Sequence, residues 1–207
     1  REMLTQWRSI GELLRSMHFP PRIEAGIEAR EALMRCNAAT LIEAARQKAR
    51  DLPRREPIVP AREPLEAALE RLPFSLTKDQ RGAIGAILDD LQKDRPMRHL
   101  LTGDVGSGKT ICYLAAVAAL AHAGRRSVVI LPNTVLAQQV FREFKTFFPD
   151  LSGRAHLCLG GKKAAPQGEP RVLIGTSALL HRKDLVRDVD LAVIDEQQRF
   201  STAQRAG

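Results

Sequence analysis

The chain has 207 residues, 44% of them hydrophobic, and a net charge of +8. This length suits one good hydrophobic core with a small helical appendage. No apolar run of about 18 residues occurs, which excludes a membrane-spanning helix, and no signal peptide is visible. The three cysteines and five histidines show no metal-ligand spacing, and the sparse cysteines predict reduced thiols in a cytoplasmic protein. The moderate positive charge suits a nucleic-acid partner without being diagnostic of one.

The first 50 residues are predicted to be helical. Apolar side chains recur at helical spacing from Leu4 to Met17, which indicates an amphipathic helix. This helix ends before the two prolines at 20–21, because proline cannot continue a helix and disfavours one before itself. A long run of helix-forming residues follows over 23–50. We interpret 1–50 as a helical connector with a structural role.

Residues 51–64 differ in composition from their surroundings. They carry prolines at 53, 57, 60 and 64 and few apolar side chains, as is typical of an extended, semi-rigid linker. A short helix is predicted next, with Pro64 near its first position. Its apolar residues are Leu65, Ala68, Leu69 and Leu72. We therefore assign 65–207 to a second, larger domain.

Thr77 and Gln80 form a T-x-x-Q capping box at the start of an apolar helix. The cap accounts for Gln80 structurally, but a helix N-terminus that faces a nucleotide base would let Thr77 and Gln80 contact adenine as well. Phe74 also has two interpretations, a ring that stacks on the base and a core residue of the short helix. Both alternatives stay open for each residue.

Residues 103–110 read G-D-V-G-S-G-K-T and fit the phosphate-binding pattern G-x-x-x-x-G-K-[ST] without a mismatch. Glycines let successive backbone N–H groups converge on phosphate oxygens, Lys109 reaches the outer phosphates, and the Thr110 hydroxyl can hold Mg²⁺. A helix that starts here turns its positive dipole end toward the same anion. The expected nucleotide contacts are Gly103, Asp104, Val105, Gly106, Ser107, Gly108, Lys109 and Thr110.

The neighbouring residues decide between this function and a glycine-rich turn with a solvated lysine. Residues 99–102 form a mostly apolar run of strand length, and 111–123 is an Ala-rich apolar run that indicates a buried helix. Strand, glycine loop and helix together are the context that a phosphate loop needs.

The rest of the chain alternates strands and helices. Strand patterns occur at 127–131, 155–159, 172–175 and 191–194, and a helix is predicted from about 134 to 148. This alternation predicts an α/β fold in which helices flank a parallel sheet, a RecA-like lobe preceded by the helical segment.

Asp195 and Glu196 follow the last of these strands. Ligands of open parallel sheets bind at the carboxyl ends of the strands, so we expect Asp195 to meet the Mg²⁺ held near Thr110. Glu196 would orient or deprotonate a water. The alternative is a pair of surface acids after a strand. With Lys109, Asp195 and Glu196 are the candidate catalytic residues.

Several motifs resemble those of the RecG family, the branched-DNA translocases of helicase superfamily two. The run D-E-Q-Q-R-F at 195–200, with Q-R at 204–205, resembles the family's D-E-Q-H-R-F-G-x-x-Q-R, and 103–110 has the family's spelling. Similar segments in the family's order are Leu76-Thr77 with Gln80, 132–139 and 175–179. The departures are Gln198 for His, Asn133-Thr134 for Thr-Glu, Ser201 for Gly, and a shortened 161–171.

The resemblance implies the first motor lobe of an ATP-driven, Mg²⁺-dependent DNA helicase that acts on branched DNA in replication-fork repair and recombination. It also implies a wedge domain before residue 1 and a second lobe, with an arginine finger, after residue 207, so both ends of the chain look cut from something longer.

The resemblance implies backbone contacts to DNA near Asn133, Thr134 and Gln139, and Thr176 and Ser177 suit a phosphate because they follow a strand end. Helix caps are an equally natural role for all of them except Gln139. The resemblance also places Gln198 where the family's His couples ATP to DNA.

Two other functions remain open. A non-catalytic, nucleotide-gated binding module would fit the departures at Gln198 and at 133–134. A phosphate-loop kinase for a small substrate is argued against by adjacent acids at 195–196. DNA-stimulated ATP turnover by the full-length protein distinguishes the helicase from both.

Overall fold

The structure, a computed structural model, describes residues 7, 9–50, 54–159 and 169–195. The chain divides into two compact units, Arg1–Arg54 and Arg55–Gly207, and each is described by itself. Within the described residues, no helix has the length and apolar character needed to cross a membrane.

The first unit contains helices α1 (Ile10–His18) and α2 (Ile23–Arg50). The sequence predicts both helices, but α1 begins later than the predicted apolar pattern, because Trp7 and Ser9 are not helical. α1 begins at Ile10 because the Ser9 hydroxyl accepts a hydrogen bond from the backbone N–H of Glu12, which caps the helix. The two helices share a small core of Leu13, Ala29 and Ala32, with Trp7, Met17 and Leu33 packed against it.

The predicted linker belongs in part to the second unit. Residues 54–60 form neither helix nor strand, but the backbone N–H of Ile58 donates to Leu91 O and that of Ala61 to Ala119 O, and Ile58 is 2% exposed. From Arg55 on, the segment is therefore docked on the lobe. Helix α3 (Arg62–Leu69) follows it and begins before the boundary predicted at residue 65.

The second unit is built on four parallel strands in the order β2-β3-β1-β4. Their bounds are β1 Ser127–Leu131, β2 Ala155–Cys158, β3 Val172–Thr176 and β4 Leu191–Ile194. Both faces of the sheet are apolar: Val129 and Ile174 belong to one core cluster, and Val128 and Leu173 to the other. The central strands β1 and β3 are buried and read as continuous apolar runs, which is why the sequence reveals them.

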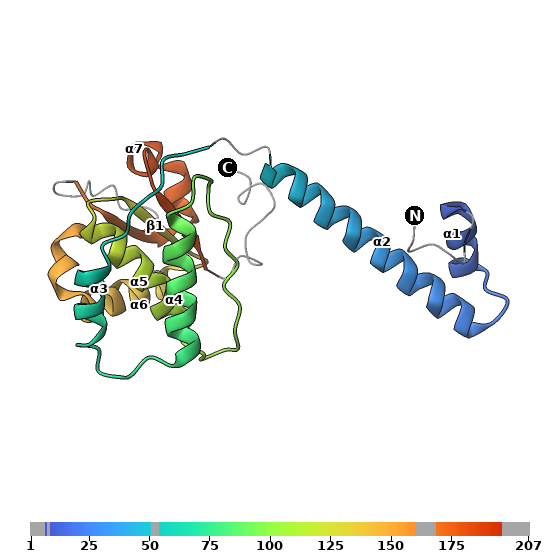
Figure 1. Cartoon of the computed structure of the whole chain (residues 1–207), viewed down its shortest axis with the longest axis horizontal. Helices are drawn as coiled ribbons and strands as arrows, with labels where there is room; N and C mark the ends of the chain where they lie inside the picture. Colours follow the sequence, from blue (N-terminus) through green and yellow to red (C-terminus); the bar gives the residue numbers. More distant parts are fainter. Residues whose placement is uncertain (1–6, 8, 51–53, 160–168, 196–207) are drawn as a thin grey trace. The chain divides into compact units, whose positions relative to one another are not determined.

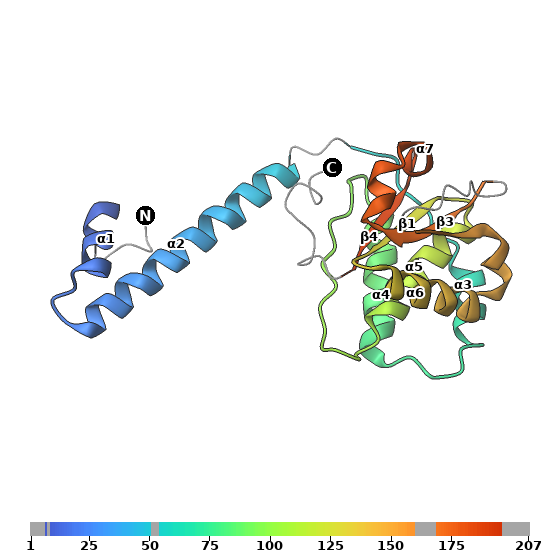
Figure 2. The same cartoon turned by 180° about the vertical axis from the view of Figure 1, so that it is seen from behind.

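Helices cover both faces of the sheet, and Figures 1 and 2 show them from opposite sides. α5 (Lys109–His122) and α6 (Thr134–Phe147) pack on one face, and the short helices η3 (Ser177–His181) and α7 (Lys183–Val186) on the other. α3 and α4 (Lys78–Leu91) pack on α5 in turn, so every residue from Ile111 to Ala121 is buried. The short helix η2 (Pro149–Arg154) leads from α6 to β2.

The strand predicted at 99–102 is wrong, because the structure has neither helix nor strand there. This segment runs beside α4, where His99 Nδ1 lies 2.9 Å from Asp90 Oδ2, and Leu100 is 75% exposed. A buried strand would need Leu100 inside the core. The phosphate-binding sequence therefore follows an irregular segment here.

Candidate functional site

The phosphate-binding sequence forms a tight loop before α5. Gly106 and Gly108 have φ angles of +81° and +77°, in the left-handed region that side chains disfavour. Gly108 is the N-cap of α5, and Lys109 is its first residue. Lys109 Nζ donates to Gly103 O at 2.7 Å and to Asp104 O at 2.8 Å. The loop thus folds around an ammonium group that would meet an incoming phosphate.

Gln80 connects this loop to α4. Its Oε1 accepts from the backbone N–H of Thr77 at 2.9 Å, and the Thr77 hydroxyl accepts from the backbone N–H of Gln80, which completes the predicted capping box. The Gln80 Nε2 donates to Ser107 O at 2.9 Å. A Cβ atom at Gly108 would overlap this amide nitrogen. The glycine at 108 therefore serves both the backbone turn and the close approach of Gln80.

Asp195 lies at the carboxyl end of β4, as predicted. Its backbone N–H donates to Ile130 O at 3.0 Å, which continues the pairing with β1. The Tyr113 hydroxyl donates to Asp195 Oδ2 at 3.1 Å. Burial, followed by the charge of Asp195, raises the pKa of Tyr113 well above its usual range, so the phenol stays protonated as a donor.

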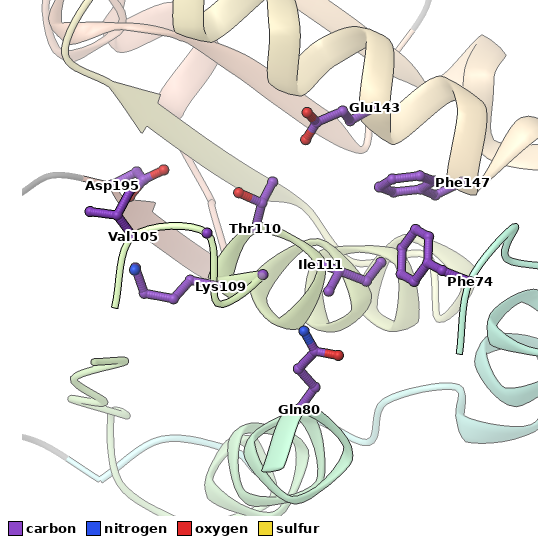
Figure 3. Close-up of a pocket in the computed structure, with 11 residues that line it drawn as sticks. Phe74, Gln80, Val105, Lys109, Thr110, Ile111, Glu143, Phe147 and Asp195 are labelled. Atoms are coloured by element: carbon purple, nitrogen blue, oxygen red, sulfur yellow. The ribbon is translucent and has the colours of Figure 1, made fainter. Parts of the chain in front are cut away.

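The loop and Asp195 share one cavity of about 490 Å³. Figure 3 shows Lys109 and Asp195 toward one end, with Gln80 and Glu143 on opposite sides. The rings of Phe74 and Phe147 form the other end, with their centroids 5.5 Å apart and their planes at 82°. The lining residues are Phe74, Gln80, Val105, Gly106, Gly108, Lys109, Thr110, Ile111, Glu143, Phe147 and Asp195.

The structure thus brings together the predicted nucleotide residues from three separate segments. Thr77, Gly103, Asp104 and Ser107 support the lining residues through the hydrogen bonds given above. Glu196 and Gln198 lie outside the described residues. Sequence reasoning missed Tyr113, Ile111 and Glu143 because they belong to no motif, and it did not place Phe147 in the cavity because helical spacing alone suits a core residue.

The residues expected to contact DNA gather at one edge of the sheet. β1 and β3 are paired so that Leu131 lies opposite Thr176. Ser177 follows β3 directly, and Asn133 follows β1 after one intervening residue. The alternative role as helix caps is present as well: Asn133 Oδ1 accepts from Leu136 N at 2.9 Å, and Thr176 Oγ1 accepts from Ala178 N at 3.4 Å.

Two further predicted DNA residues lie on α6. Thr134 is the first residue of the helix, and Gln139 Nε2 donates to Glu143 Oε1 at 2.9 Å. This contact connects a residue expected on the DNA side with a carboxylate that lines the nucleotide cavity. DNA contact itself stays a prediction for all five residues.

The chain is similar to known helicases. RecG of Aquifex aeolicus is 38% identical over 150 residues, which cover 68% of this chain and 19% of that protein. RecG of Borreliella burgdorferi is 30% identical over 206 residues, 95% of this chain and 30% of that protein. The transcription-repair-coupling factor of Myxococcus xanthus is 38% identical over 141 residues, 64% of this chain and 12% of that protein.

Solved structures agree with this similarity. A structure of RecG bound to a three-way DNA junction superposes with a TM-score of 0.65 at 26% identity, over 88% of this chain and 30% of that chain. The UvsW helicase of bacteriophage T4 has a TM-score of 0.53 at 16% identity, over 73% of this chain and 56% of that one, and shows the shared fold. The chain spans only 19% to 23% of the first RecG relatives.

A family description, DEAD/DEAH box helicase, matches residues 77–206. That stretch runs from the capping threonine of α4 past the phosphate loop and Asp195, and so contains most of the cavity described above. The chain belongs to the DEAD/DEAH box helicase family, and within it resembles RecG.

Proposed function

We propose that the chain is the ATP-binding first motor lobe of a RecG-like DNA helicase, a double-stranded-DNA translocase that acts on branched DNA in replication-fork repair and recombination. The observation that carries this proposal is the single cavity that holds both the phosphate loop and Asp195. The similarity to RecG proteins, one of them solved on a DNA junction, supports the DNA substrate.

The cavity residues fit ATP with Mg²⁺. The loop supplies backbone donors and the ammonium of Lys109 for phosphate oxygens. Thr110 and Asp195 offer a hydroxyl and a carboxylate in the same cavity, and Mg²⁺ prefers such oxygen ligands. When bound, the ion would neutralise charge that develops on the transferred phosphoryl group. Glu196, directly after Asp195 in sequence, would orient or deprotonate the attacking water.

The nucleoside would occupy the end of the cavity away from Lys109. Phe74 and Phe147 present aromatic surface there, Phe74 with 42% of its area exposed, and aromatic rings offer a face on which a base can stack. Gln80, on the side of α4, would supply the polar contact to adenine.

The proposed partners lie at the edge of the sheet and beyond the chain. Backbone phosphates of DNA would contact Asn133, Thr134, Gln139, Thr176 and Ser177, without reading base sequence. Gln198 would couple the nucleotide to DNA.

In this assignment residues 1–50 are a connector, 65–207 the motor lobe, and a wedge domain and second lobe belong to the complete protein. We place that protein in the cytoplasm, where an ATP-driven DNA motor finds ATP and its DNA.

Nucleotide binding by the 207-residue chain tests the first step. Lys109→Ala removes charge-assisted hydrogen bonds worth about 1.5–3 kcal/mol each, so the affinity for labelled ADP with Mg²⁺ should fall at least about tenfold. Lys93→Ala is the matched control, because this exposed lysine pairs with Asp90 on α4 and does not line the cavity. Equal affinities in all three proteins would refute the assignment.

ATP turnover by the complete protein tests the second step. Phosphoryl transfer in this class needs an arginine from across the cleft, worth roughly 10³–10⁵ in rate, so we expect DNA-stimulated turnover only when the second lobe is present. A complete protein that binds ATP but never turns it over with DNA would instead be the nucleotide-gated binding module.

A further inference from the structure

Tyr113 is a buried hydroxyl beside the proposed metal site. It lies on α5, one turn after Thr110, and only 7% of its surface is exposed. Its neighbours on the helix are apolar, and Cys112 and Leu114 are buried with it. A phenol in such a place needs a hydrogen-bond partner, and the partner is the Asp195 carboxylate at 3.1 Å.

This hydrogen bond joins the two segments that the proposed metal site requires. Thr110 is on α5, and Asp195 directly follows β4. Tyr113 and Asp195 are 82 residues apart in the sequence. The Tyr113 hydroxyl donates to Oδ2 of Asp195, and Tyr113 lies one turn after Thr110 on the same helix. The phenol therefore contacts one oxygen ligand expected for Mg²⁺, Asp195, and lies on the helix that carries the other, Thr110.

We infer that Tyr113 is a positioning residue that fixes the Asp195 carboxylate in the orientation needed for Mg²⁺ beside Thr110. This inference rests on the proposed nucleotide site. An aspartate carboxylate rotates readily about its χ2 bond. A hydrogen bond from a rigid phenol held in the core of the lobe restricts this rotation. Hydrogen-bond partners of metal ligands act in this way, and their loss typically costs about 10–100-fold in metal affinity or activity.

The proposed role of Tyr113 predicts how nucleotide binding should depend on the metal. Tyr113 acts only through Asp195, so its hydroxyl should matter when a metal is present and should not matter for nucleotide binding without metal. A purely structural tyrosine would lower both affinities together, because a distorted α5 would also distort the phosphate loop that begins it.

The experiment compares wild type with Tyr113→Phe, which removes one oxygen and keeps the ring. The affinity of the 207-residue chain for labelled ADP is measured with Mg²⁺ and with EDTA, and the ratio of the two gives the gain due to the metal. In the phenylalanine variant we expect the affinity in EDTA to be unchanged and the gain, or the apparent affinity for Mg²⁺, to fall about tenfold or more.

Asp195→Ala provides the second arm. If the tyrosine works through this carboxylate, adding Tyr113→Phe to Asp195→Ala should produce no further loss, so the double-mutant cycle should show full coupling. Thr110→Val, which removes a proposed ligand directly, sets the scale for complete loss of the gain.

Three results would overturn the inference. An unchanged gain in Tyr113→Phe would mean that Asp195 is oriented without it, and an equal loss in EDTA would mean that the tyrosine serves packing. Additive losses in the double variant would mean that it acts independently of Asp195. A wild-type chain that binds no ADP under either condition would instead refute the proposed function, on which this inference depends.

Discussion

Replacement of Gly108 by alanine should destabilise the lobe more than the same change at Gly106. Both glycines have φ near +80°, so each alanine carries a similar backbone cost of about 1–2 kcal/mol. At Gly106 the new Cβ meets nothing within 4 Å, whereas at Gly108 it would overlap Gln80 Nε2. The amide of Gln80 must then move, which breaks two hydrogen bonds: the one that Nε2 donates to Ser107 O and the one that Oε1 accepts from the backbone N–H of Thr77.

The size of the difference follows from those two bonds. A typical hydrogen bond contributes about 0.5–1.5 kcal/mol, and these are exposed enough for water to compensate in part. We therefore expect Gly108→Ala to cost about 1 kcal/mol more than Gly106→Ala in urea unfolding followed by circular dichroism. In a Gln80→Ala background the two alanines should cost the same, since the overlap is gone. Equal costs in the natural background would show that Gln80 does not hold the loop in this way.

Two further predictions concern the sheet and the step that couples ATP to DNA. Gly175→Ala should destabilise the lobe by about 1–3 kcal/mol in urea unfolding, because its Cβ would overlap the backbone oxygen of Cys158 on the paired strand β2. Gly82→Ala is the control on the exposed side of α4, where the Cβ meets nothing within 4 Å, and it should stabilise the lobe by up to about 1 kcal/mol. A larger loss of stability in Gly82→Ala than in Gly175→Ala would contradict the packing argument. For Gln198, an amide keeps a donor and an acceptor but cannot gain the charge of an imidazole with pKa near 6.5, so Gln198→His in the complete protein should make DNA-stimulated turnover depend more steeply on pH between about 5.5 and 7.5. Identical pH profiles would remove the coupling role.

The sequence predicts most of the lobe because its elements follow simple patterns. The central strands β1 and β3 are buried and read as apolar runs, and α5 is apolar on all sides because α3, α4 and the sheet surround it. The run at 99–102 is as long as strands β2 and β4, and its prediction failed because the exposure of Leu100 and the contact of His99 with Asp90 depend on tertiary structure. The docking of Ile58 was invisible for the same reason, since its partner Leu91 is remote in sequence.

The candidate site divides in the same way between local and remote contacts. The phosphate loop and Asp195 are set by local sequence and by the rule for carboxyl ends of strands, so they were predictable. Tyr113 was not, because nothing in an apolar helix marks a hydroxyl whose partner is 82 residues away. Residues that position others are recognised by their tertiary partners, whereas residues that bind a phosphate are recognised by type and spacing.

Gln80 shows how a structural and a binding role can coexist in one side chain. An amide offers two N–H donors and an oxygen with two lone pairs. The cap uses one lone pair of Oε1, through Thr77 N, and the loop uses one N–H of Nε2, through Ser107 O. One donor and one lone pair remain, which is the set that a glutamine needs to bind adenine through its N6 and N7 atoms. An adenine contact would leave the cap closed if the remaining donor and lone pair lie on the same edge of the amide, and the two interpretations of the T-x-x-Q sequence would then both hold.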